Sequence, residues 1–503
     1  MLFLLIYIRF SSPDCIAQQD SAQGDTSRIE LLHADHLSYN EKVTGKVRRM
    51  LGHVAFKQQN TFLYCDSAYF YNDSDYVEAY SHVHIVQGDT VNIYSDRMNY
   101  DGDRKLADLF KHVKMTDKTM TMTTEILHYD LNTDVAHYPD HAKIIDSENT
   151  LTSLEGYYYS EFKEFFFRKD VVLVNPQYTM KSDTLKYNTN NKTAYFFGPT
   201  NITSKENHIY CEDGRYNTET DESTFYKNSW IQSKEQRLKG DSLWYNRKEG
   251  IGKAYRNIQI KDTVQKILIT GHYAEYHELN QISWVTDSAL MIQIFKNDSL
   301  FLHADTLKSV YDSVCQIRSM FAYHHTRFFK PDLSGSCDSL YYSTEDSMMR
   351  MYYTPVIWSK ENQLTADTIF IQMSNSHIER LELYRSSFII SQEDTFRFNQ
   401  VKGKNMTGYF VNDTLNSIKV EGNGQSVYYA KDKDNKYVGV NRSDCSDMMI
   451  LLKDNKVSMI TLITSPDATF YPISELTPNE LKLKDFNWLI KKEPLKMEDV
   501  FRE

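Results

Sequence analysis

The feature that most constrains the fold of this chain is a sequence pattern that returns about every thirty residues. In its clearest copy, Ile93-Tyr-Ser-Asp-Arg-Met-Asn-Tyr-Asp101, a small residue precedes an acidic one, and an apolar and an aromatic residue follow two and four places later. Such a fixed period indicates stacked repeats. The acidic position recurs, with weaker later copies, at Asp35, Asp66, Asp96, Glu125, Glu155, Asp183, Glu212, Asp241, His272, Asp305, Asp338 and Asp367.

The apolar face of each copy shifts by one residue at the acidic position. Residues three and one places before the acid share one strand face, whereas residues two and four places after it would share the other. A bulge or corner at the acid keeps both sets on the same side. We therefore expect the carboxylates to mark bends and to accept hydrogen bonds from backbone N–H groups that the bend leaves unpaired. The strongest candidates are Asp35, Asp66, Asp96, Glu125, Asp183 and Asp241.

A second alternating segment, such as Val83-His-Ile85, follows the first segment of each copy and indicates a return strand. The predicted class is all-β: an elongated, repeat-built β-jellyroll, a folded-over two-walled antiparallel stack with about 12–14 repeats of about 30 residues. An apolar channel is expected between the walls. Its predicted lining is Leu63, Ile93, Met122, Met180, Ile209, Leu238, Ile269, Leu302, Phe70, Tyr100, Tyr129, Tyr187 and Tyr245.

The chain divides into four predicted regions. Residues 1–17 are a predicted signal peptide, because the apolar run Leu2–Ile8 is followed by the small residue Ala17, and the protein is therefore expected to be exported. Residues 28–400 form the repeat array, and residues 401–465 form degenerate terminal repeats or a cap. Residues 466–503 form a C-terminal tail, since three of its prolines exclude central strands.

Composition and motifs argue against several functions. The formal net charge of -11 and the absence of basic runs argue against a nucleic-acid partner. A column of acids along the whole chain does not resemble the single carboxylate pair of a glycosidase. His82-x-His84 and His324-His325 lack a third metal ligand. We expect no enzymatic activity, metal or cofactor.

The aromatic column of the repeats has two interpretations. Each residue is most simply part of a packed core. As a continuous strip, however, the column is also a suitable lining for an extended apolar ligand. The residues alone leave both interpretations open.

Three segments resemble the OstA-like repeats of the LptA family, which includes the N-terminal domains of LptD proteins. They are Asn60-Thr-Phe-Leu-Tyr-Cys-Asp-Ser-Ala-Tyr-Phe, Ser81-His-Val-His-Ile-Val-Gln-Gly88 and Val91-Asn-Ile-Tyr-Ser-Asp-Arg-Met-Asn-Tyr100. The resemblance covers about residues 28 to 430. The chain is far longer than a single bridging protein of that family.

The resemblance implies an exported protein, periplasmic or outer-membrane-associated, that binds lipopolysaccharide, shields the acyl chains of lipid A in an apolar channel and helps deliver them to the outer membrane. It also implies inner-membrane LptC-like and outer-membrane LptD-like partners, with end-to-end self-association as a further possibility. The alternative is a secreted structural or carbohydrate-binding β-solenoid, such as a scaffold or adhesin. That alternative predicts aromatic side chains on the outer face, whereas a lipid conduit predicts them inside.

Overall fold

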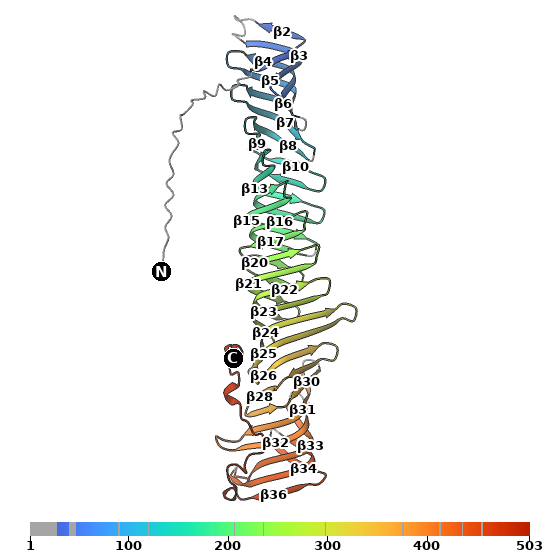
Figure 1. Ribbon diagram of the computed structural model, residues 1–503, viewed down its shortest axis with the longest axis vertical. Helices are drawn as coiled ribbons and strands as arrows, with labels where there is room; N and C mark the ends of the chain where they lie inside the picture. The colour runs from blue at the N-terminus through green and yellow to red at the C-terminus, as the bar shows by residue number, and fades with distance from the viewer. Residues whose placement is uncertain are drawn as a thin grey trace, which may run out of the picture. The chain divides into compact units, whose positions relative to one another are not determined.

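The computed structural model describes residues 28–502 except 40–46, 89–90, 119, 206, 235, 297, 375–376, 412–413, 435 and 454–455. The predicted signal peptide, residues 1–17, lies outside the described residues. The described residues form two compact units: those of unit 1 lie within Met1–Ser147 and Glu155–Glu161, and those of unit 2 lie within Glu148–Leu154 and Phe162–Glu503. Each unit is a succession of antiparallel strands (Figure 1), which confirms the predicted all-β, repeat-built fold.

The strands of unit 1 are β1 (Glu30–His33), β2 (His36–Tyr39), β3 (Val47–Gln58), β4 (Thr61–Tyr71), β5 (Tyr76–Gln87), β6 (Val91–Asp101), β7 (Leu106–Thr116), β8 (Thr121–Asp130), β9 (Val135–Tyr138), β10 (Ala142–Ile145) and β12 (Glu155–Tyr159). Unit 2 begins with β11 (Thr150–Ser153), β13 (Glu164–Val174), β14 (Tyr178–Asn188), β15 (Thr193–Ser204), β16 (His208–Asn217), β17 (Glu222–Tyr226), β18 (Trp230–Gln232), β19 (Gln236–Lys239), β20 (Ser242–Asn246), β21 (Ile251–Asp262), β22 (Ile267–His277), β23 (Ile282–Ile294) and β24 (Ser299–Asp312).

Unit 2 continues with β25 (Ile317–Lys330), β26 (Leu333–Ser343), β27 (Met348–Tyr352), β28 (Val356–Ser359), β29 (Asn362–Thr365), β30 (Thr368–Ser374), β31 (His377–Gln392), β32 (Phe398–Val411), β33 (Thr414–Lys431), β34 (Tyr437–Lys453), β35 (Lys456–Ile463) and β36 (Asp467–Tyr471). Three short 3₁₀ helices follow: η1 (Ile473–Glu475), η2 (Ile490–Lys492) and η3 (Met497–Phe501).

The long strands are bent, and each contributes to two walls. The first half of β8 pairs with β10, whereas its second half pairs with β9. The strand β16 divides in the same way between β18 and β17, and β26 divides between β28 and β27. We call the wall before the acidic position wall A and the wall after it wall B. In β4, for example, Thr61–Tyr64 lies in wall A and Ser67–Tyr71 lies in wall B.

The apolar side chains of both walls point into the space between them. In unit 1, Ile93 and Met115 of wall A and Met98 and Leu109 of wall B are almost completely buried. In the later part of unit 2, a second core joins buried residues from Met291 to Ile450. The alternation that leads to this arrangement is the one that the sequence pattern predicts, because every second side chain of a strand faces the same side.

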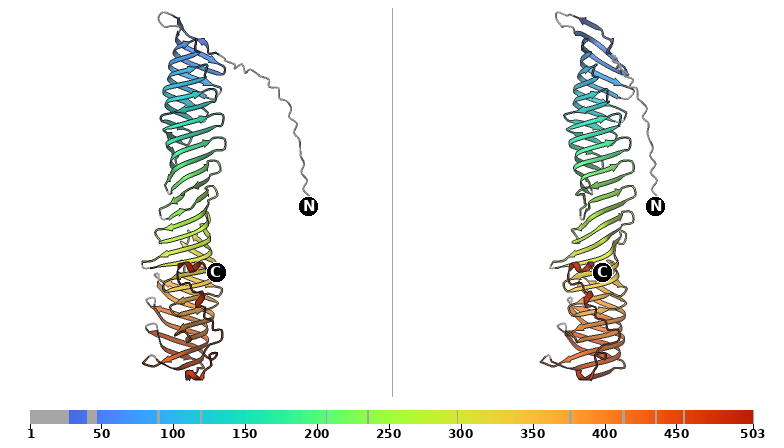
Figure 2. Two further views of the ribbon diagram at one scale, coloured as in Figure 1. Left: turned by 90° about the vertical axis from the view of Figure 1, so that its left-hand side faces the viewer. Right: turned by 60° about the vertical axis from the view of Figure 1, so that its left-hand side comes forward.

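The C-terminal segment after β36 runs back along the outer face of wall A. It starts beside β34, where η1 makes contact, and ends with η3 against β24 and β25. The segment ends close to β25 in the picture, in agreement with these contacts (Figures 1 and 2). Its side chains Leu481, Phe486 and Trp488 pack on an apolar cluster outside the wall, which includes Phe388 and Val427.

Candidate functional site

The residues predicted to line a channel are buried to different degrees along the chain. Leu63, Ile93, Met122, Met180, Leu302, Phe70, Tyr100 and Tyr129 are buried. Ile209, Leu238, Ile269, Tyr187 and Tyr245 are only partly buried. The predicted set is therefore divided between a closed interior and a more open one.

The interior of unit 1 is closed along the edge where the hairpin loops of the two walls face each other. The Gln58 amide, at the end of wall A, donates to the Gly102 carbonyl at 3.1 Å and accepts a hydrogen bond from the Tyr100 hydroxyl of wall B. A further bond of 2.7 Å joins Gln87 of wall A to Asp134 of wall B. These polar contacts close the edge over the apolar side chains, which leaves that part of the interior as a packed core.

The interior is more open in unit 2 between β16 and β22. Here wall A consists partly of the short strands β18 and β19, which have three and four residues. Their inward side chains Ile231 and Leu238 face each other in register, and Leu238 also pairs with Ile260. All three are only partly buried. A strip of apolar side chains that water can still reach is a surface on which an apolar ligand gains free energy by displacing that water.

The inward tyrosines carry their hydroxyl groups to the polar edge of wall B. Tyr216 donates to Asp221 at 2.8 Å, and Tyr245 donates to Glu278 at 2.8 Å. Burial, together with the Glu278 carboxylate, raises the pKa of Tyr245 to about 12, so the phenol is neutral at physiological pH. These tyrosines thus present an apolar ring to the interior and a polar group to the edge.

The six acids predicted to mark bends all lie where the chain passes from wall A to wall B. Asp66, Asp96, Glu125 and Asp183 lie at shifts of pairing register within β4, β6, β8 and β14. The other two lie between consecutive short strands, Asp35 between β1 and β2, and Asp241 between β19 and β20.

The carboxylates of Asp35, Asp66, Asp96 and Asp241 hydrogen-bond to side chains on the opposite strand of the corner, whereas that of Asp183 accepts from Thr184 on its own strand. The sequence analysis missed these partners. Asp66 bonds the Nδ1 atom of His82 at 2.7 Å, and Asp96 bonds that of His112 at 2.7 Å. In later copies asparagine replaces histidine, as where Asn257 donates to Asp241 at 2.9 Å. The corner is thus held by pairs of side chains sixteen residues apart.

The opposite strand turns the corner through two successive residues with left-handed backbone. Ser81 and His82 have φ values of 61° and 49°, and Arg256 and Asn257 have 57° and 49°. Histidine and asparagine are among the residues that tolerate this region best. At Gly52, with φ 77°, an added Cβ would collide with the Asp35 carboxylate. The sequence does contain a signal for these corners: an aromatic residue, a polar residue and a His, Asn or Ser recur in this order in the return strands.

We expect the Asp66–His82 contact to be visible in a pH titration. The hydrogen bond from Asp66 raises the pKa of the His82 imidazole above its usual value. The favourable contribution of this pair is therefore complete below the usual histidine pKa and is lost as the pH rises through the raised one. NMR should show that Asp66→Asn lowers the His82 midpoint. His303, whose pKa burial lowers, is the internal control that should not move. An unchanged His82 midpoint would contradict the pairing.

Metal-binding groups are not assembled in the part of the chain that the structure describes. No group of three or more His, Cys, Asp or Glu side chains there could hold a metal ion. Burial raises the pKa of the Cys65, Cys211 and Cys337 thiols to about 12, so these thiols are not activated nucleophiles. Over the same residues, no helix combines the length and the apolar character needed to cross a bilayer.

A bent, two-walled stack of antiparallel strands around an apolar interior defines a class of β-jellyroll repeat proteins. The family model described as OstA-like protein matches residues 26–183 and again residues 181–241. Residues 26–241 are therefore similar to the OstA-like family, as the repeat motifs predict. Among curated proteins, no match to the chain was found.

Proposed function

We propose that this protein binds lipopolysaccharide in the periplasm and shields the acyl chains of lipid A between its walls during delivery to the outer membrane. OstA-like proteins form a transport and binding family involved in lipopolysaccharide and organic-solvent transport. The observation that supports the proposal most directly is the partly open apolar strip of unit 2, which contains Ile209, Leu238 and Ile269.

The strip is suited to acyl chains because it is long, apolar and uniform. Each buried methylene contributes about 0.8 kcal/mol, so a lipid chain gains affinity in small, nearly equal steps. Neighbouring positions such as Ile231 and Ile260 flank Leu238 on adjoining strands and offer the same chemistry. A ligand can therefore move along the strip while it stays shielded from water. The closed edge of unit 1 would have to open before a lipid could pass there.

A photo-crosslinking residue at Leu238 should capture lipopolysaccharide in cells, whereas the same probe at Lys239 should not. Leu238 pairs with inward residues, and Lys239 is exposed and pairs with the outward Trp230. The two probes differ by one residue and therefore by one face of the strand. Immunoblotting for the lipid after irradiation measures the capture. Equal labelling at both positions, or no labelling in the exported and folded protein, would exclude the conduit.

We further propose LptC-like and LptD-like partners at the two ends of the repeat array. Among the described residues, β1 and β2 pair only with β3, and β35 and β36 pair only with β34. Strands with one unpaired edge can add a strand from another chain, and a second copy of this protein could bind in the same way. Periplasmic fractionation and cross-linking of the exported protein would test these assignments.

The alternative, a carbohydrate-binding scaffold, is favoured by one observation. Aromatic side chains lie on the outer face of wall B as well as inside, for example Tyr226 and Tyr255, each more than one-third exposed. Outer aromatics alone do not exclude a conduit, because the inner tyrosines are also present. These exposed aromatic side chains indicate that the outer face of wall B could bind a ligand of its own.

A further inference from the structure

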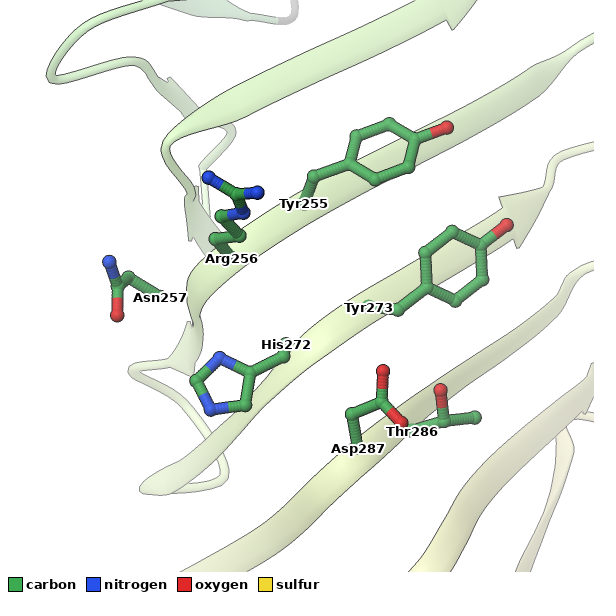
Figure 3. Close-up of a pocket in the computed structure, with 7 residues that line it drawn as sticks. All are labelled: Tyr255, Arg256, Asn257, His272, Tyr273, Thr286 and Asp287. Atoms are coloured by element: carbon green, nitrogen blue, oxygen red, sulfur yellow. The ribbon is translucent and has the colours of Figure 1, made fainter. Parts of the chain in front are cut away.

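A hollow on the outer face of wall B in unit 2 lies at the corner between β21, β22 and β23. Its volume is about 650 Å³, and Tyr255, Tyr273, His272 and Asp287 line it. The rings of Tyr255 and Tyr273 lie side by side on neighbouring strands (Figure 3), with centroids 5.5 Å apart. A second hollow of about 280 Å³ adjoins it and shares Tyr255. Together they form one surface groove, which we call the corner groove.

The corner groove occurs where the regular pairing of the corners changes. At Asp66 and Asp96 the corner is filled by a hydrogen bond to a histidine sixteen residues later. In the copy at the groove, histidine occupies the acidic position as His272, and the left-handed pair opposite is Asp287 with Ser288. Among the described residues, His272 has no hydrogen bond to Ser288, sixteen residues later, or to Asp287. Polar groups that close the other corners are therefore available here to a ligand.

The lining of the corner groove combines flat aromatic surfaces with cations. The second hollow adds Trp244, Arg215 and Lys253 to the lining, and Arg256 belongs to the first. The Lys253 ammonium lies 5.4 Å from the centre of the Trp244 ring. Three permanent cations thus line the groove against one carboxylate, that of Asp287.

Two acids lie near the groove without lining it, and each accepts hydrogen bonds from a partner of its own. Glu275 accepts hydrogen bonds from the Tyr273 hydroxyl and, at 2.8 Å, from His277. Asp241 accepts from Asn257 at 2.9 Å. In a chain with a net charge of -11, a lining with three cations and one carboxylate is a distinctive feature.

We propose that the corner groove binds an anionic oligosaccharide. Sugar rings present apolar faces that pack on tyrosine and tryptophan, and their hydroxyl groups suit Thr286, Asn257 and Asp287. Carboxylate or phosphate substituents pair with arginine and lysine. The two adjoining hollows match an extended chain of several sugars more closely than a single small molecule. The groove is separate from the apolar interior, so the inference stands independently of lipid conduction.

The ligand could be the sugar chain of a glycolipid or a free acidic polysaccharide, and two probes distinguish these sources. One is an oligogalacturonate hexasaccharide, and the other is the phosphorylated core oligosaccharide obtained by delipidation of lipopolysaccharide. Calorimetry with the exported full-length protein should detect one of them with a Kd of about 10 μM to 1 mM. Maltohexaose, which is neutral, should bind at least about tenfold more weakly, and salt should weaken the binding of the anionic probe.

The variants Tyr255→Ala and Arg256→Gln should each weaken binding of the preferred probe about tenfold or more. The matched control is Tyr384→Ala. Tyr384 precedes a left-handed pair in the same way as Tyr255, and the two side chains are 37% and 39% exposed, but Tyr384 lies outside the groove. Melting curves of all three variants should stay close to that of the parent, because these side chains are at the surface.

Binding of neither anionic probe up to about 10 mM would overturn the proposal, as would equal losses in Tyr255→Ala and Tyr384→Ala. Preference for the core oligosaccharide would identify the glycolipid as the source, and preference for oligogalacturonate would identify a free polysaccharide. Lipid crosslinking at Leu238 is read out separately, so failure of the groove and failure of the conduit can be told apart.

Discussion

Deletion of residues 472–503 is expected to destabilise the last repeats and to make the protein aggregate. The deleted segment covers an apolar cluster on the outer face of wall A that contains Phe388, Ile390, Val427, Tyr429 and Val440. Each such side chain gains about 1.5–3 kcal/mol from burial, so uncovering part of the cluster costs several kcal/mol. Ordering the tail has an entropic cost that offsets part of this gain. Large exposed apolar patches promote association between molecules.

Two buried glutamine side chains attach the tail to wall A. Gln400 donates to the Leu481 carbonyl at 2.8 Å and accepts from the Leu483 N–H at 2.9 Å. Gln363 donates to the Asn487 carbonyl at 2.7 Å and accepts from the Leu489 N–H at 2.6 Å. Both amides are 1% exposed. Each buried amide therefore satisfies two backbone groups of the tail.

Hydrogen exchange measures the effect of the deletion. Amides of β31–β34 should exchange about 100-fold faster or more, whereas those of unit 1 should keep their rates. The milder variant Gln400→Ala should cost about 1–3 kcal/mol, because it leaves the tail groups unpaired. Gln425→Ala is its control, since Gln425 bonds Asp444 at the surface. Unchanged exchange after the deletion would show that the tail does not contribute to stability.

Alanine substitutions should lower the free energy of unfolding by different amounts in the closed interior of unit 1 and in the open interior of unit 2. Leu109 in unit 1 has no exposed surface, and Leu238 in unit 2 is partly exposed. Leu109→Ala should lower the free energy of unfolding by about 2–5 kcal/mol, because it removes packed methyl groups and leaves a cavity. Leu238→Ala removes side-chain area that is less completely buried and should cost about 1 kcal/mol.

For lipid capture we expect the opposite order, with the larger effect from Leu238→Ala. Leu238→Ala should reduce crosslinking of lipopolysaccharide through a probe at the neighbouring inward position Ile260, whereas Leu109→Ala should leave it unchanged in protein that remains folded. Chemical denaturation, followed by fluorescence, measures the first quantity, and immunoblotting measures the second. Similar unfolding costs for both variants would show that the interior is packed equally in both units.

The repeat pattern by itself determined the architecture of this protein. A period of about 30 residues, an alternation of apolar side chains and a one-residue shift at Asp66 or Asp96 are local properties. They predict bent strands in two walls because side-chain direction in a strand depends only on position along it. The same logic placed Ile93 and Leu238 on the inner face.

Only the tertiary structure decided which parts of the interior are closed and how the outer faces are used. The bond between Gln87 and Asp134 joins hairpin loops 47 residues apart, and Gln363 and Leu489 are 126 residues apart. Such contacts depend on how repeats stack and where the tail returns, and no periodicity encodes them. The pairing of Asp66 with His82 was in principle readable from a constant spacing. The open strip around Leu238 could not be predicted in this way, because it lies where wall A consists partly of the short strands β18 and β19, whose inward side chains are only partly buried.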